Sequence, residues 1–177
     1  MSNELTLPQQ GDRADIYASL IPQIEALIGG ETSVIANLAN TAAALKTAFD
    51  FWWVGFYLVE TSPTREALAS SHQSELVLGP FQGPVACTRI AKGKGVCGSA
   101  WEQQTLIRVD DVDQFPGHIA CSAASRSEIV VPIIAHGKVQ AVLDIDSAHL
   151  ADFSDIDEQA LSRLALSLAA SFAAESR

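Results

Sequence analysis

The sequence predicts one α+β domain, in which N- and C-terminal helices pack on one face of a central antiparallel sheet. Two observations predict this class. Apolar residues recur at helical spacing at both ends of the chain, whereas aromatic and β-branched runs typical of strands occupy its middle. The chain has 177 residues, of which 48% are hydrophobic, enough for one full core and too few for two. We therefore expect a single domain over residues 1–177, with its core at about residues 30–172.

Two helices are expected first. Apolar side chains recur at helical spacing within residues 16–27, and Gly29-Gly30 supplies a stop. A second series with the same spacing occupies residues 34–45.

The middle of the chain favours strands. The segments are 52–59, 76–78, 106–109, 128–135 and 139–145. The last two are joined by His136-Gly137-Lys138, which suits a tight turn and indicates a meander of antiparallel strands. The polar connection at 60–75 contains a proline and is expected to form an exposed hairpin or loop.

A long helix is expected to close the chain. Ser154, followed by Asp157 and Glu158, resembles a helix N-terminal cap. An apolar stripe then runs from Ile156 to Phe172, which predicts a helix of about five turns.

The charge of the chain excludes some partners. The chain carries 11 Lys and Arg against 21 Asp and Glu, with a net charge of -10 and a pI near 4.6. Such a charge repels a phosphate backbone, so nucleic-acid binding is not expected. The N-terminus lacks the basic and apolar regions of a secretory signal, and the longest apolar tract, 164–174, is shorter than the ~20 residues of a membrane span. We expect a cytoplasmic protein with no membrane partner.

All three cysteines lie in two of the most Gly-rich stretches, 83–97 and 117–128, with acidic residues just downstream. An odd number of cysteines in a chain without an export signal argues for metal, redox or plain buried roles. Cys87, Cys97 and Cys121 each have small neighbours that permit close approach of a second thiol or a substrate. Thiols beside carboxylates are typical of a redox site.

Two other chemistries fit these stretches less well. Residues 93–98 match G-x-G-x-x-G, but they lie mid-chain without a βαβ unit, so a turn that opens a short helix is the simpler interpretation. His118 and Cys121 could join Cys87 and Cys97 in a zinc site, but the gap between Cys87 and Cys97 lacks the close spacing of a zinc knuckle. We expect no bound metal.

Asp144 and Asp146 flank Ile145 in an otherwise apolar strand, so both carboxylates project from one face. They are either ordinary surface charges or parts of a site. An ammonium ligand, or a proton shared near neutral pH, would explain two like charges there. Glu128, at the head of the preceding strand, would reach the same region across the Gly137 turn.

Seven segments together resemble the free methionine-(R)-sulfoxide reductases, which are small single-domain proteins of the GAF fold. The matching segments cover most of residues 30–165. Generic GAF domains that sense small ligands do not share this set of three cysteines. The segments are 30–33 (GETS), 53–58 (WVGFYL), 76–83 (LVLGPFQG), 95–98 (GVCG), 117–121 (GHIAC), 127–130 (SEIV) and 142–147 (VLDIDS).

The resemblance implies that the protein reduces free methionine-(R)-sulfoxide by thiol chemistry. Cys121 resembles the thiol that attacks the sulfoxide, which becomes methionine while the cysteine is oxidised to the sulfenic level. Cys87 and Cys97 resemble the resolving or accessory thiols, and which of them closes the intramolecular disulfide stays open. No bound cofactor is implied, and thioredoxin or a similar dithiol would donate the electrons.

The resemblance also implies a substrate pocket. Glu128, Asp144 and Asp146 match its acidic residues, and Trp53 matches an aromatic wall beside the substrate methyl group. We assign Asp144 to the substrate ammonium group, and Glu128 with Asp146 to the sulfoxide oxygen. Because peptide-bound methionine sulfoxide lacks the free ammonium group, this assignment explains a restriction to the free amino acid.

The sequence departs from the family pattern in two places. The connection at about 61–73 looks longer than the family's short turn, and Ser122 and Arg126 stand where other members often have Asp and Asn.

The main rival function is that of a noncatalytic GAF domain, which senses a small molecule or its own oxidation. The oligomeric state stays open, although the opening and closing helices of GAF domains often form a dimer face.

Overall fold

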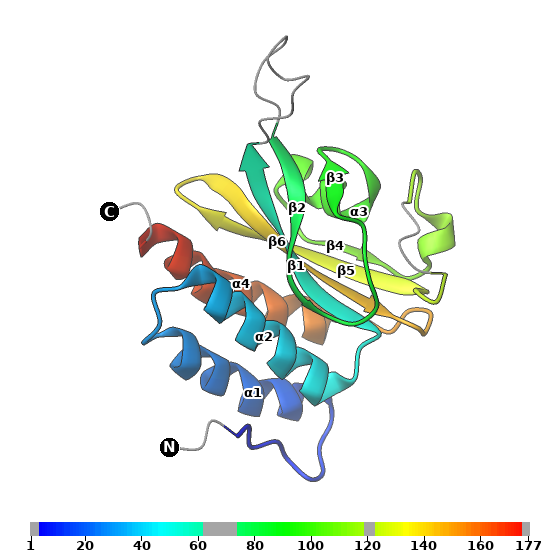
Figure 1. The fold of residues 1–177 in the computed structure, drawn as a ribbon. Helices are drawn as coiled ribbons and strands as arrows, with labels where there is room; N and C mark the ends of the chain where they lie inside the picture. The colour runs from blue at the N-terminus through cyan, green and yellow to red at the C-terminus, as the bar shows by residue number, and fades with distance from the viewer. Residues whose placement is uncertain (1–3, 62–73, 119–122, 175–177) are drawn as a thin grey trace.

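The computed structural model describes residues 4–61, 74–118 and 123–174, so Cys121 and Ser122 lie outside the described residues. Within these ranges the chain forms four α-helices and six strands (Figure 1). In chain order they are α1 (Arg13–Ile28), α2 (Val34–Phe49), β1 (Trp53–Thr61), β2 (Ser74–Gln82), β3 (Arg89–Ala91), α3 (Gly95–Gln103), β4 (Ile107–Val109), β5 (Ser127–Ala135), β6 (Lys138–Ser147) and α4 (Asp155–Ala174). A 3-10 turn at Val112–Gln114 follows β4.

The described strands form one sheet in the order β3-β2-β1-β6-β5-β4, with antiparallel pairing throughout. Strands β1 to β3 pair in sequence on one side, strands β4 to β6 on the other, and β1 joins β6 in the middle. Strands β5 and β6 are connected through His136 and Gly137, whose positive φ angles of 52° and 71° suit a two-residue hairpin turn. The predicted antiparallel sheet and tight turn are confirmed.

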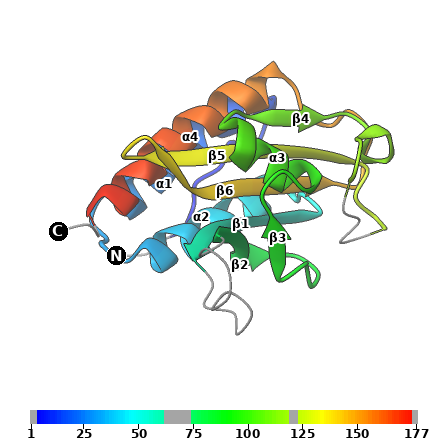
Figure 2. The same ribbon diagram turned by 90° about the horizontal axis from the view of Figure 1, so that it is seen from above.

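Helices α1, α2 and α4 cover one face of the sheet, and α3 lies against the other (Figure 2). The three-helix side forms the larger apolar core, in which Leu20, Leu38 and Leu164 are fully buried against strands β1, β5 and β6. The predicted packing of the terminal helices on one face is therefore confirmed. Residues Val96 and Trp101 of α3 belong to a second, smaller apolar cluster on the opposite face.

Helix α4 begins after Ser154, as the sequence predicts. The Ser154 hydroxyl oxygen accepts from the Ile156 amide at 3.3 Å, and the Ser154 amide donates to Asp157 Oδ2 at 2.8 Å. The prediction that Ile156 starts the apolar stripe was wrong, because this side chain is 41% exposed. The buried residue of the first turn is Asp157, whose Oδ1 accepts from the Tyr17 hydroxyl at 2.9 Å and from Arg13 at 3.0 Å.

Strands β1 and β2 form a hairpin, in which Thr61 pairs with Ser74 at the end next to the connection. Its residues 62–73 lie outside the described part of the chain. Residues 93–98 form the turn that opens α3, which agrees with the simpler interpretation of the glycine motif. None of the helices in the described ranges combines the length and hydrophobicity that a membrane span requires.

Candidate active site

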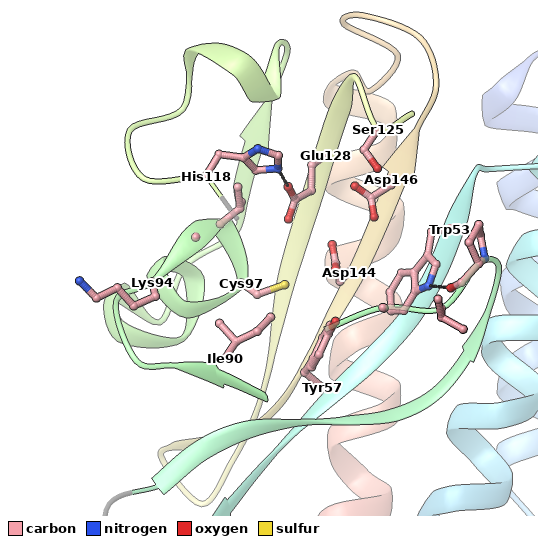
Figure 3. Close-up of a pocket in the computed structure, with 15 residues that line it drawn as sticks. Trp53, Tyr57, Ile90, Lys94, Cys97, His118, Ser125, Glu128, Asp144 and Asp146 are labelled. Carbon is pink, nitrogen blue, oxygen red and sulfur yellow. Dashed lines mark hydrogen bonds and ion pairs between the residues drawn. The ribbon is translucent and has the colours of Figure 1, made fainter. Parts of the chain in front are cut away.

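A pocket opens on the sheet face that carries α3 (Figure 3). Strands β1, β5 and β6 supply its floor, the start of α3 forms a wall, and the segment 84–86 borders it. The lining residues are Trp53, Tyr57, Pro84, Val85, Ala86, Ile90, Lys94, Gly95, Val96, Cys97, His118, Ser125, Glu128, Asp144 and Asp146. The pocket therefore combines a group of carboxyls with an aromatic side.

Three carboxyl groups meet on the floor of this pocket. Glu128 pairs with Asp146 across β5 and β6, and Asp144 lies two residues before Asp146 on the same face of β6. Glu128 is 6% exposed and Asp144 is 7% exposed. The intervening Ile145 belongs to the core under the three helices. These carboxyl groups are thus clustered and largely buried, and they are not ordinary surface charges.

The cluster holds protons more tightly than ordinary carboxyl groups do. Burial raises the pKa of Glu128 well above its usual value, and the charges of Asp144 and Asp146 raise it further. Burial, followed by the charge of Asp146, also raises the pKa of Asp144. Burial raises the pKa of Asp146 to about 6, although a hydrogen bond with Ser125 opposes the shift. The pocket can therefore donate a proton near neutral pH.

Cys97, in the first turn of α3, faces the same cluster (Figure 3). Its thiol is buried, and burial followed by the charge of Asp144 raises the pKa of Cys97 well above that of a free cysteine. The thiol sulfur and an Asp144 carboxyl oxygen lie within 4.8 Å of each other. Asp144 Oδ1 is nevertheless buried without a hydrogen-bond partner among the described residues. Since such an oxygen costs ~1–3 kcal/mol, Asp144 is suited to accept a donor from a ligand.

Trp53 forms the aromatic side of the pocket. Its ring stacks on Phe81 with 5.4 Å between centroids, and its Nε1 donates to the Pro84 carbonyl oxygen at 3.0 Å. Gly83, just before this contact, has a φ of +140°, and a Cβ there would lie 2.6 Å from Trp53 Cδ1. Only glycine allows the chain to pass this close to the indole. Trp53 therefore fixes the segment that leads to Cys87.

The chain is similar to known proteins over most of its length. The sequence model of the GAF domain matches residues 31–173. The chain is 51% identical over 164 residues to GAF domain-containing protein A of Dictyostelium discoideum, covering 93% of this chain and 96% of that protein. It is 46% identical over 158 residues to the free methionine-R-sulfoxide reductase of Escherichia coli K12, covering 89% of this chain and 88% of that protein.

A solved structure agrees with these sequence matches. The free methionine-R-sulfoxide reductase of Neisseria meningitidis, in complex with its substrate, aligns with a TM-score of 0.89 and 50% identity, covering 99% of this chain and 98% of that chain. The chain belongs to the free methionine-R-sulfoxide reductase family of GAF domains. The predicted fold class, a single GAF domain, is confirmed by this family membership.

The cysteines of this GAF domain differ in their states. Cys97 is a free thiol, whereas Cys87 is disulfide-bonded and half-buried. Cys121 lies outside the described residues, so the structure does not test its assignment as the attacking thiol. A disulfide-bonded Cys87 cannot be a zinc ligand, and Cys97 faces Asp144 and Glu128, so the described residues do not support the zinc set considered from the sequence.

The lining of this GAF pocket also includes Tyr57, Ser125 and His118, which were not assigned to the substrate from the sequence. Tyr57 lies four residues after Trp53 on β1, so the alternation of the strand already indicated that it shares the Trp53 face. Ser125 lines the pocket beside Asp146 and opposes the rise in the pKa of that carboxyl group, and no spacing in the sequence indicates this neighbour. His118 Nε2 lies 3.8 Å from a Glu128 carboxyl oxygen, a contact that also requires the folded chain.

Proposed function

We propose that the protein reduces free methionine-(R)-sulfoxide to methionine. The observation that carries this proposal is the buried Asp144 Oδ1, which has no donor among the described residues, in a pocket that also holds proton-retaining carboxyl groups and an aromatic side. An amino acid with an ammonium group and a sulfoxide oxygen fits this combination. The names of the relatives from E. coli and N. meningitidis support the same activity.

The α-ammonium and α-carboxylate groups of the amino acid determine how this end of the substrate is held. Asp144 accepts a hydrogen bond from the α-ammonium group, which supplies a donor to Oδ1, an oxygen that no donor reaches within the described ranges. The α-carboxylate lies near the first turn of α3, where Lys94 makes no side-chain cap and backbone amides are available. Methionine sulfoxide within a peptide lacks both charges, and we therefore expect the pocket to reject it.

The other end of the substrate lies between Trp53 and the carboxyl groups. Glu128 and Asp146 hydrogen-bond the sulfoxide oxygen, and the raised pKa of Glu128 keeps a proton available for transfer to that oxygen. The methyl group packs against Trp53 and Tyr57. Binding the oxygen and the methyl group on different sides selects one epimer at sulfur.

The redox step uses two thiols. The Cys121 thiolate attacks the sulfoxide sulfur while the oxygen is protonated, and oxygen transfer leaves methionine and a sulfenic acid at Cys121. A second thiol then attacks this sulfenic sulfur, which releases water and closes a disulfide. The balance is one sulfoxide and two thiols converted to methionine, a disulfide and water. We assign the second thiol to Cys87, because Cys97 is buried and its pKa is raised.

Thioredoxin, a dithiol protein, reopens the disulfide by exchange and so supplies the two electrons of each cycle. No bound cofactor is needed for this chemistry. Because the cycle requires a reducing compartment, we place the protein in the cytoplasm.

The proposal is tested by NADPH consumption in the presence of thioredoxin and thioredoxin reductase. The free (R) epimer should be reduced, whereas the (S) epimer and the N-acetylated (R) form should not. Cys121→Ser should abolish turnover. Cys87→Ser should release one methionine per protein molecule in a single turnover and then stop, because the oxidised Cys121 is no longer resolved.

Cys97→Ser is the matched control and should still form the disulfide. Steady turnover by Cys87→Ser together with loss of turnover in Cys97→Ser would reverse the assignment of the resolving thiol. Sulfoxide binding without turnover, in folded and reduced protein, would contradict the enzyme assignment and favour a noncatalytic sensor.

A further inference from the structure

We propose that a divalent cation with affinity for sulfur and oxygen ligands, such as Zn²⁺, binds inside the pocket through Cys97, Glu128 and Asp144 and blocks it. This ligand set differs from the one considered from the sequence, in which His118 and Cys121 would join Cys87 and Cys97; only Cys97 is common to both. Binding of the cation is independent of the proposed function. The expected competition between the cation and methionine sulfoxide rests on the proposed function.

The three side chains converge from different elements of the fold. Cys97 belongs to α3, Glu128 to β5 and Asp144 to β6, and all three are buried. One sulfur atom and two carboxyl oxygens lie within 4.8 Å of one another. Two ligands of the same zinc ion are separated by at most the sum of their bond lengths, about 4.5 Å. The spacing of the three atoms is therefore within a few tenths of an ångström of what one zinc ion can span.

A second observation indicates that the site needs a ligand. Asp144 Oδ1 is buried without a hydrogen-bond partner among the described residues, and the side chain points into the pocket (Figure 3). A cation bound by the Asp144 carboxyl group would supply this buried oxygen with a positive partner. The neighbouring Asp146 carboxyl adds negative charge, which favours a cation further.

The set leaves room for a competing ligand. Three protein ligands leave the fourth position of a tetrahedral ion open toward the pocket. Thiol and carboxyl protons must leave when the ion binds, so binding releases protons. A cation on Asp144 occupies the carboxyl group that we assign to the substrate ammonium group. The cation and the amino acid should therefore exclude each other.

Titration with Cd²⁺ alone tests the site, because a cadmium–thiolate bond absorbs in the ultraviolet. The Cys87→Ser, Cys121→Ser double variant retains Cys97 as the single remaining cysteine of the three in the chain. We expect one bound Cd²⁺ per molecule with a charge-transfer band. Adding Cys97→Ser should abolish the band, and adding Asp144→Asn should weaken binding by about tenfold or more.

Glu60→Gln, which changes an exposed carboxyl group of β1, is the matched control and should leave the titration unchanged. Circular dichroism and thermal melting verify the fold of each variant. Asp144→Asn retains the thiol, so it tests the site even where the loss of Cys97 disturbs folding. Absence of the band in the double variant, or equal affinity with and without Asp144→Asn, would overturn the proposal.

Free methionine-(R)-sulfoxide added to the same double variant tests the competition. This variant cannot turn over, so the measurement reports binding alone. The apparent Kd for Cd²⁺ should rise with sulfoxide concentration. A cadmium band that saturating sulfoxide does not affect would overturn the assignment of the ammonium group to Asp144 and leave the metal site intact, which separates the two failures.

Discussion

The Asp144 carboxyl group illustrates how a single residue can be arranged for binding at the expense of stability. It interacts with the Cys97 thiol and with Glu128, while Oδ1 has no partner among the described residues. Burial and a neighbouring carboxyl group raise its pKa. A folded protein gains nothing from a buried oxygen without a donor, so the arrangement is best explained by a ligand that brings one.

Asp144→Asn should chiefly weaken binding of free methionine-(R)-sulfoxide. The amide cannot provide the negative charge that holds an ammonium group, and a hydrogen bond between charged groups contributes ~1.5–3 kcal/mol. We expect KM to rise about 10- to 100-fold with a smaller change in kcat, measured in the thioredoxin-coupled assay. Glu128→Gln should instead lower kcat, because it removes the proton donor. An unchanged KM in Asp144→Asn would contradict the assignment.

At the scale of elements, the start of β1 and the segment after β2 act as one unit. Trp53 begins β1, and its indole N–H holds the Pro84 carbonyl oxygen. Gly83 allows the chain to pass closely beneath the ring. Because Cys87 follows three residues after Pro84, the indole orients the segment that carries the proposed resolving thiol.

Trp53→Phe should slow the closing of the disulfide more than the reduction of the sulfoxide. The ring remains as a wall for the methyl group, but the hydrogen bond to Pro84 is lost, which corresponds to ~0.5–1.5 kcal/mol or up to about tenfold in rate. Rapid-quench mass spectrometry should show accumulation of the sulfenic acid at Cys121. Equal slowing of methionine release and disulfide formation would argue against a role in orienting Cys87.

The first turn of α4 is attached to α1 through a buried carboxylate. Asp157→Ala removes the acceptor for Tyr17 and Arg13 and also the contact with the Ser154 amide. We expect the free energy of unfolding to fall by ~2–4 kcal/mol, as for other broken buried pairs. Urea denaturation measures the change. Asp155→Asn, at a side chain that is 83% exposed, is the control and should lower stability by less than ~1 kcal/mol.

At the scale of the whole molecule, the two faces of the sheet have different roles. The face under α1, α2 and α4 carries the larger apolar core, which supports stability. The face under α3 carries the proton-retaining cluster of Glu128, Asp144 and Asp146. Stability and chemistry therefore come from opposite sides of the same strands, since side chains alternate along each strand.

The acidic cluster should make the protein less stable as the pH rises. The folded pKa of Asp146 is about 6, above its ordinary value of 3.8, so folding favours the protonated form. This contribution is complete below pH ~4 and is lost as the pH rises through ~6. Asp146→Asn should therefore raise the free energy of unfolding at pH 8 by ~1–3 kcal/mol, with little change at pH 4. Urea denaturation at both pH values measures the difference.

Asp155→Asn again serves as the control, because a mostly exposed carboxyl group should show no such pH-dependent gain. If Asp146→Asn raised the free energy of unfolding equally at pH 4 and pH 8, ionisation of Asp146 would not be what limits stability.

Much of this architecture was predictable from local patterns. The helices at both ends, the antiparallel strands and the turn at His136-Gly137 follow from apolar periodicity and turn chemistry, which depend on neighbouring residues alone. The shared face of Asp144 and Asp146 follows from strand alternation in the same way. The error at Ile156 arose because Asp157 is buried by partners in α1, far away in the sequence.

The contacts within the site came only with the packing of distant segments. Cys97 meets Asp144 because α3 packs on the sheet face opposite the three larger helices, and no spacing in the chain encodes this meeting. The raised pKa values likewise depend on burial, as does the absence of a donor to Asp144 Oδ1 in the part of the chain that the structure describes, and local sequence does not determine burial. Periodicity in the sequence specifies on which face of a strand or helix a side chain lies. The contacts and the charge state of that side chain depend on the groups that the tertiary structure packs against this face.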